Sequence, residues 1–172
     1  MKRSPLQLEW ITYPSATFEA LLREHPSPGA QMSHVSARVI YQLDGRHSAE
    51  LTITAADEDA AGAAYAFKIE ALAGFSFCLD EALAAYKVER NKLPNVLAVN
   101  MARSLYASAR EYLALITSRA PHGGLVLESA LIDESDVKIG SVDSQAEVMS
   151  AVFGLSEAGD GEHAPKKRRA AR

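Results

Sequence analysis

The sequence predicts an α+β fold in which helices cover one face of an antiparallel sheet. Four early segments alternate apolar and polar residues, which is the period of a strand with one buried face. These segments span about residues 5–13, 35–43, 49–55 and 65–72. Two later segments, 93–118 and 145–155, repeat apolar residues at helical spacing. Strands followed by helices are typical of α+β proteins, so we expect a four-stranded antiparallel meander with a long helix and a second C-terminal helix on one face.

The first strand is followed by a segment that the pattern leaves open. Alternation is clear up to Trp10 and its neighbours. Residues 15–24 can form a short helix or an irregular turn, with Phe18 and Leu21 as its apolar anchors. The prolines and glycine of residues 25–30, HPSPGA, indicate a loop.

The next three strands are bounded by turn signals. Asp44-Gly45 separates the second strand from the third, and this dipeptide favours a hairpin because glycine accepts a positive φ. A polar break at residues 57–62 precedes the fourth strand, which Gly74 is expected to end. Residues 75–92 begin extended and become helical, with Asp80 as the candidate N-cap.

The long helix, residues 93–118, is unusually apolar. Pro94 lies in its first turn, where the missing N–H costs nothing. Apolar side chains occupy almost two faces and leave a narrow polar stripe. The stripe consists of Asn100, Arg103, Arg110 and Glu111. Since one sheet covers one face, the other face should meet a second subunit or stay open for a ligand.

The helix is predicted to stop at Ala120-Pro121, because proline disfavours helical geometry in the residue before it. Residues 125–132 alternate again and should be extended, and Ser144 is the candidate N-cap of the second helix. From Ser156 the chain carries glycine, alanine and charge without an apolar anchor. We therefore expect one domain over residues 1–155 and a disordered tail with a basic end over 156–172.

Composition limits the class of protein. Nearly half of the residues are apolar, no run is long enough to span a membrane, and the N-terminus lacks a secretory apolar segment. Cys78 is the single cysteine, so we expect a cytoplasmic protein that neither forms an internal disulfide nor inserts into a membrane.

Charge is divided unevenly along the chain. The last seven residues, KKRRAAR, hold five of the 18 basic residues. Without them, 13 basic residues face 22 acidic ones, a balance of −9. An acidic body argues against nucleic acid as the main partner and suits a basic partner surface or solubility alone.

Residues that could carry catalysis or bind a cofactor are scarce. The five histidines show no metal-ligand spacing, and neither a Gly-rich phosphate loop nor a nucleophile elbow is present. His122 beside Gly123-Gly124 could line an oxyanion pocket but fits an ordinary turn better. Glu111 is expected to be solvated, and Cys78 to be a small buried apolar residue, because its acidic neighbours oppose a reactive thiolate. We therefore expect no enzyme, no metal and no cofactor.

Apolar residues are in surplus outside the meander, in the segments 75–77, 125–131 and 149–153. A sheet with one helix cannot bury all of them. The surplus therefore predicts an oligomer interface or a site for apolar partners.

Three motifs resemble the protein-export chaperone SecB family. They are LQLEWITYPSATFEA at residues 6–20, FKIEALAGFSF at 67–77 and LYASAREYLALITSR at 105–119. The third is the most similar, since the family helix carries an aromatic residue shortly before Ala-Arg-Glu and ends on Ser-Arg. A Leu-x-Leu pair, Leu125 and Leu127, follows as in the family.

The resemblance implies an ATP-independent holdase that keeps preproteins unfolded for Sec-dependent export and passes them to the motor SecA. Members are homotetramers, dimers of dimers, with long helices between two eight-stranded sheets. The implied client-binding groove consists of Val39, Tyr41, Phe75, Phe77, Leu125, Leu127, Met149 and Phe153. The expected oligomer interface consists of Leu97, Met101, Leu105, Tyr106, Ala109, Tyr112, Leu113 and Ile116. The implied motor-docking acids are Glu9, Glu50 and Glu70.

Two features differ from the family pattern. Pro94-Asn95 lies further upstream than the corresponding helix start, which lengthens the helix by about two turns. The tail ends in PKKRRAAR, where the family tail is usually acidic or neutral. The alternative function is therefore a SecB-like chaperone dedicated to one partner, such as the antitoxin of a toxin–antitoxin system.

Overall fold

The computed structural model describes residues 4–22, 33–55 and 63–155. The expected loop at 25–30, the polar break at 57–62 and the tail at 156–172 lie outside the described residues.

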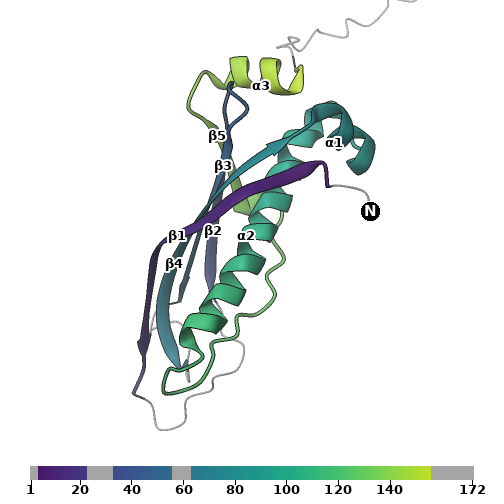
Figure 1. The fold of residues 1–172 in the computed structure, drawn as a ribbon. Helices are drawn as coiled ribbons and strands as arrows, with labels where there is room; N and C mark the ends of the chain where they lie inside the picture. The colour runs from purple at the N-terminus through teal and green to yellow at the C-terminus, as the bar shows by residue number, and fades with distance from the viewer. Residues whose placement is uncertain (1–3, 23–32, 56–62, 156–172) are drawn as a thin grey trace, which may run out of the picture.

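The described chain forms a five-stranded sheet with the strand order β1-β4-β3-β2-β5 (Figure 1). The strands are β1 (Leu6–Ala20), β2 (His34–Tyr41), β3 (His47–Ala55), β4 (Tyr65–Phe77) and β5 (Val137–Ser141). Neighbouring strands are antiparallel except for β5, which runs parallel to β2. The β2–β3–β4 meander is therefore confirmed, but β1 joins it beside β4, and a fifth strand that the pattern did not predict extends its other side.

The long helix lies across one face of this sheet. The helices are α1 (Leu79–Tyr86), α2 (Leu93–Thr117) and α3 (Gln145–Phe153), with short 3-10 turns η2 (Arg90–Lys92) and η3 (Glu134–Asp136). Helix α2 contacts β2, β3, β4 and β5, and its inner side chains form one core with the sheet. Figure 1 shows α2 running along the sheet and α3 near the end of β5. The α+β class with a long helix and a C-terminal helix is confirmed.

Strand β1 continues to Ala20, so the short helix or irregular turn expected over 15–24 is wrong for residues 15–20, and residues 23–24 lie outside the described residues. Its 15 residues pair with the 13 residues of β4. Register shifts between Leu8 and Trp10 and between Thr12 and Ser15 take up the two extra residues as β-bulges. Pro14 lies in the second bulge, where its missing N–H breaks no regular ladder pair. Leu21 reaches the core, whereas Phe18 is 41% exposed and contacts Tyr65 edge-on.

Gly74 does not end the fourth strand, which passes through it to Phe77. Trp10 pairs with Gly74, and a Cβ at residue 74 would overlap the indole ring. Glycine is therefore required here by the close approach of an aromatic side chain rather than by a turn.

Some of the expected turn and cap residues are confirmed, and one is wrong. Gly45 has a φ of 76° in the β2–β3 turn, and Asp44 Oδ1 accepts the Arg46 N–H at 2.9 Å, so the hairpin is confirmed. Asp80 is not the N-cap of α1; Cys78 holds that position, and Asp80 stands in the first turn, where its charge favours the helix dipole. Ser144 is the N-cap residue of α3, although its side chain makes no capping bond.

Candidate functional site

The outer side of α2 is partly covered by the segment between α2 and η3, which we call the strap (residues 119–133). Figure 1 shows this segment running back alongside the helix. Arg103 donates from Nε and Nη2 to the Ile132 carbonyl at 2.9 and 2.7 Å, and the Tyr106 hydroxyl donates to the Glu128 carbonyl at 2.6 Å. Thr117 Oγ1 accepts the Leu125 N–H at 2.7 Å. Helix side chains thus hold the backbone of the strap, which also makes an isolated β-bridge at Leu127.

The start of the strap is fixed to the sheet. The Tyr65 hydroxyl donates to the Gly123 carbonyl at 2.7 Å and accepts the His122 N–H at 3.1 Å. His122 Nε2 lies 3.0 Å from the Leu21 carbonyl, so its ring joins this turn to the end of β1. His122 is therefore engaged in holding the turn, in line with the ordinary-turn interpretation.

A shallow hollow lies between α2 and the strap. It has a volume of about 280 Å³ and opens to the surface. Its lining residues are Ala107, Arg110, Glu111, Ala114, Leu125, Val126 and Leu127. Val126 is 51% exposed, and Leu115, one residue beyond Ala114 on the helix, is 71% exposed. The hollow is therefore an apolar surface with Arg110 and Glu111 at its rim.

The predicted client-binding residues are mostly part of the core. Six of them are fully buried, namely Val39, Tyr41, Phe75, Leu125, Leu127 and Phe153. Phe77 and Met149 are half-buried. Their assignment to client binding stays a prediction, and the side chains that face solvent are different ones.

Four of these residues meet in an aromatic cluster where α3 joins the sheet. The Phe153 ring lies 4.9 Å from Tyr41, edge-on, and 5.5 Å from Phe77, stacked. Tyr41 also contacts Phe75, and its hydroxyl donates to the Pro94 carbonyl of α2 at 2.7 Å. The cluster therefore joins β2, β4, α2 and α3, whereas Leu125 and Leu127 lie apart from it in the strap.

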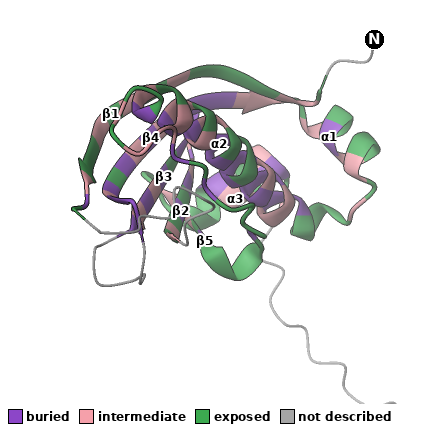
Figure 2. Cartoon of the chain, turned by 90° about the horizontal axis from the view of Figure 1, so that it is seen from below, coloured by how far each residue is buried: buried purple, intermediate pink, exposed green. Residues whose placement is uncertain are grey.

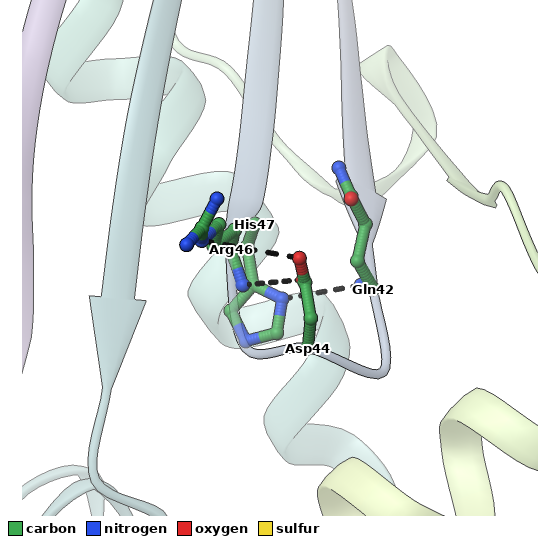
Figure 3. Close-up of polar contacts among 4 residues, drawn as sticks. All are labelled: Gln42, Asp44, Arg46 and His47. Carbon is green, nitrogen blue, oxygen red and sulfur yellow. Dashed lines mark hydrogen bonds and ion pairs between the residues drawn. The ribbon is translucent and has the colours of Figure 1, made fainter.

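The sequence analysis missed His47, which belongs to the same cluster. Its ring lies 5.0 Å from Phe77, and its Nδ1 accepts the Gln42 N–H at 3.2 Å across the hairpin (Figure 3). Burial lowers the pKa of His47 to about 4, while the nearby Asp44 and Glu9 carboxylates act in the opposite direction. His47 is therefore neutral and structural at pH 7. Its alternation with Ala49 and Leu51 along β3 is the signal that marks it as inward-facing.

The predicted oligomer interface is also largely internal to the chain. Leu97, Met101, Leu105, Tyr106, Ala109 and Leu113 are buried, and Tyr112 and Ile116 are half-buried. Tyr112 stacks on Tyr13 of β1 with ring centroids 4.1 Å apart. We define the outer stripe of α2 as the exposed or half-buried residues Ser104, Ala107, Ser108, Glu111 and Leu115. This stripe, rather than the buried face, is what α2 presents to solvent.

The predicted motor-docking acids are not gathered at one place. Glu50 and Glu70 stand on neighbouring strands β3 and β4, where Glu50 pairs with Leu72 and Glu70 with Thr52. Glu70 forms an ion pair with Lys68 at 2.6 Å. Glu9 lies in the first bulge of β1, several residue pairs further along the sheet. Their docking role stays a prediction.

Cys78 is exposed, so the expectation of a buried cysteine is wrong. It follows Phe77 at the point where the chain leaves the sheet and begins α1. Glu111 is exposed, as expected. Among the described residues, no group of three or more His, Cys, Asp or Glu side chains could hold a metal ion, and no helix has the length and apolarity to cross a membrane.

Comparison with known proteins gives little further information. No family model matches the chain, and no curated protein matches it. A solved structure of a SecB-like chaperone from Mycobacterium tuberculosis, in complex with a peptide from an antitoxin, matches 74% of this chain and 91% of its own chain. The two are 18% identical, with a TM-score of 0.49. A likeness of this extent carries no argument about function.

Proposed function

We propose that this protein is an ATP-independent chaperone that binds unfolded or partly folded polypeptides at apolar surface. The observation that carries the proposal is the number of large apolar side chains left in solvent. These are Leu8, Trp10, Phe18, Leu22, Leu43, Leu115, Val126, Leu131 and Val142. Single exposed apolar residues are common, but this many on a small domain favours a surface that binds apolar partners.

The hollow between α2 and the strap is the proposed centre of client binding. Its wall is apolar and shallow, which suits many different side chains better than one shaped ligand. Arg110 and Glu111 at the rim offer one charge of each sign. The SecB resemblance of residues 105–119 covers the helical wall of this hollow, and this supports the same assignment from the sequence.

We propose that clients are preproteins for Sec-dependent export in the cytoplasm, and that the acidic residues Glu9, Glu50 and Glu70 dock the motor SecA. The alternative client is a single partner such as an antitoxin. Client range separates the two. A general holdase delays aggregation of several unrelated unfolded proteins, whereas a dedicated chaperone protects one.

We also propose that the protein assembles as a dimer of dimers through α2. The outer stripe of α2 includes the small residues Ser104 and Ser108, which do not line the hollow and which permit close approach of a second helix. Leu115 extends the stripe with a large exposed apolar side chain. Burial of Leu115 against a second copy would remove about 2 kcal/mol of unfavourable exposure per side chain.

The test of the proposed function is suppression of aggregation. A chemically unfolded client is diluted into buffer with stoichiometric amounts of the protein, and light scattering is followed. The protein should delay aggregation without ATP, and Val126→Asp, which places a charge in the hollow, should weaken the delay several-fold. Thr12→Asp is the matched control because Thr12 is an exposed polar residue of β1 outside the hollow. Aggregation at the same rate with and without the protein would refute the proposal.

A further inference from the structure

The sheet ends in two edge strands that differ in kind. Within the described part of the chain, β1 pairs only with β4, and β5 pairs only with β2. Each therefore turns one row of backbone N–H and C=O groups away from the sheet. Such a row can hydrogen-bond to any extended polypeptide, whatever its sequence.

Strand β1 has irregularities that interrupt its outer row of backbone N–H and C=O groups. Two bulges change its register, at Leu8/Trp10 and at Thr12/Ser15, and Pro14 lacks an N–H. In Figure 2 it is drawn as mostly exposed and half-buried along its length. Bulges and proline on an edge strand are known means of opposing addition of a further strand.

Strand β5 has no such protection. Its five residues pair with β2 in unbroken parallel register, from Ala37 with Val137 to Tyr41 with Ser141. Gly140 lets the Arg38 side chain cross the strand, since a Cβ there would lie 3.2 Å from the guanidinium. The pairing of β5 is therefore regular, and among the described residues no second strand pairs with its outer row.

Apolar side chains lie at the end of this edge. The last pair, Tyr41 with Ser141, places the residues that follow each strand near one another. Among these residues, Val142 is 74% exposed and Leu43 is 47% exposed. Val142 directly follows β5 and can pack against an apolar side chain of an added strand, whereas Leu43 follows β2 and lies on the far side of β5 from the edge.

Charge on the open face of the sheet indicates the polar side of the partner. Arg38 and Lys138 pair in the β2–β5 register and are both exposed. Glu50, opposite Arg38 on β3, lies on the far side of Arg38 from the edge. Lys138 on β5 and the Arg38 guanidinium beside Gly140 are therefore two positive charges close to an added strand, and they favour an acidic residue opposite them.

We propose that β5 binds an extended client segment by strand addition, and that the preferred segment alternates apolar with acidic or small polar residues. The inference rests on the proposed chaperone function and adds a second mode of contact to it. The hollow beside α2 takes apolar side chains, while the β5 edge takes main-chain groups. Together, the hollow and the β5 edge would bind client segments of many different sequences.

The test uses the full-length protein and a labelled short peptide that alternates valine with threonine and glutamate. The control is the same peptide with every central backbone nitrogen methylated, which keeps the side chains but removes the hydrogen-bond donors. Fluorescence anisotropy measures binding, and amide hydrogen exchange locates it. We expect the amides of residues 137–141 that turn away from β2 to exchange at least about tenfold more slowly with the peptide, while β1 is unchanged. The methylated peptide should bind at least tenfold more weakly.

Two proline variants test whether the N–H groups of β5 that turn away from β2 bind the peptide. Lys138→Pro and Ile139→Pro remove adjacent N–H groups, which point to opposite sides of a strand, so one variant keeps the β2 ladder. That variant should melt like the natural protein and lose tenfold or more in peptide affinity.

The outcomes are distinct. A protein that neither binds the peptide nor delays aggregation overturns the proposed function. A peptide that binds but slows exchange only in α2 and the strap overturns strand addition alone. Protection of β5 that rises with protein concentration in the absence of peptide shows that a second copy occupies the edge, and this also overturns the proposal.

Discussion

At the scale of single residues, His47 makes folding sensitive to pH. Its Nδ1 must be unprotonated to accept the Gln42 N–H, and it lies among Tyr41, Phe75 and Phe77. The pKa of His47 is lowered to about 4, against an ordinary value of 6.5. The unfolded chain therefore binds a proton at a higher pH than the folded chain does, and stability falls as pH drops from about 6.5 to about 4.

The measurement is urea unfolding at several pH values. The natural protein should lose up to about 3 kcal/mol of unfolding free energy across this range, and little above pH 7. His47→Asn keeps an acceptor near Gln42 but does not titrate, so its unfolding free energy should fall less steeply. The same slope in both proteins would show that another group causes the pH dependence.

Stability also depends on the close contact between Trp10 and Gly74. A Cβ at residue 74 overlaps the indole, so Gly74→Ala should displace Trp10 and cost about 1–3 kcal/mol of unfolding free energy. In a Trp10→Ala background the same substitution should cost much less, because the overlapping ring is absent. Trp10 is the single tryptophan, so its fluorescence reports the displacement directly. An unchanged emission spectrum in Gly74→Ala would contradict the predicted displacement.

At the scale of elements, the strap depends on bonds from α2. Arg103 gives two N–H groups to the Ile132 carbonyl, whereas Arg110 makes one long, exposed bond of 3.4 Å to Ser129. Arg103→Ala should therefore cost about 1–3 kcal/mol and speed amide exchange and proteolysis within residues 128–133. Arg110→Ala is the matched control and should change stability by less than about 0.5 kcal/mol. Equal effects of the two would show that the carbonyl bonds do not hold the strap.

The sequence predicted those elements whose pattern is undisturbed. Alternation in β2 and β3 is regular, because one face packs on α2 and the other meets solvent. In β1 each bulge adds one residue and so changes which residues face the helix, from Leu8 to Ile11 and then to Ala16. A fixed period of two cannot follow that change, which is why the second half of β1 looked like a helix. Strand β5 was missed because its five residues offer only Val137 and Ile139 as apolar signals.

Periodicity has a similar limit for the candidate functional site on α2, because it does not show what each apolar residue contacts. Periodicity placed Leu105 on one apolar face of α2 and Leu113 toward the far side, but it cannot say which apolar residues meet the chain's own sheet and which a second subunit. In the structure both Leu105 and Leu113 are buried within the chain. Leu115 is another apolar residue of the helical pattern, and yet it faces solvent because the strap does not cover it. Only the path of the chain after α2 distinguishes these cases.

At the scale of the whole molecule, the outer stripe of α2 is the surface that we propose a second copy covers. The sheet covers one side of the helix and the strap a second, and the stripe of Ser104, Ala107, Ser108, Glu111 and Leu115 stays open. Two copies related by a twofold axis would place the same stripe on both sides of the contact, so one substitution alters the interface twice. Small residues on the stripe bring the helices close, which makes a charge introduced there costly to bury.

Leu115→Glu should therefore shift the protein from a tetramer or dimer to a smaller species. Because Leu115 is 71% exposed in the folded chain, the variant should retain the far-ultraviolet circular dichroism of the natural protein. Light scattering coupled to size-exclusion chromatography measures the mass, and Leu22→Glu, on the strand side, is the control that should leave it unchanged. If the natural protein is already a monomer at micromolar concentration, the α2 interface is wrong, and Leu115 belongs instead to the client-binding surface beside Val126. In that case Leu115→Glu would weaken the delay of client aggregation without any change in mass.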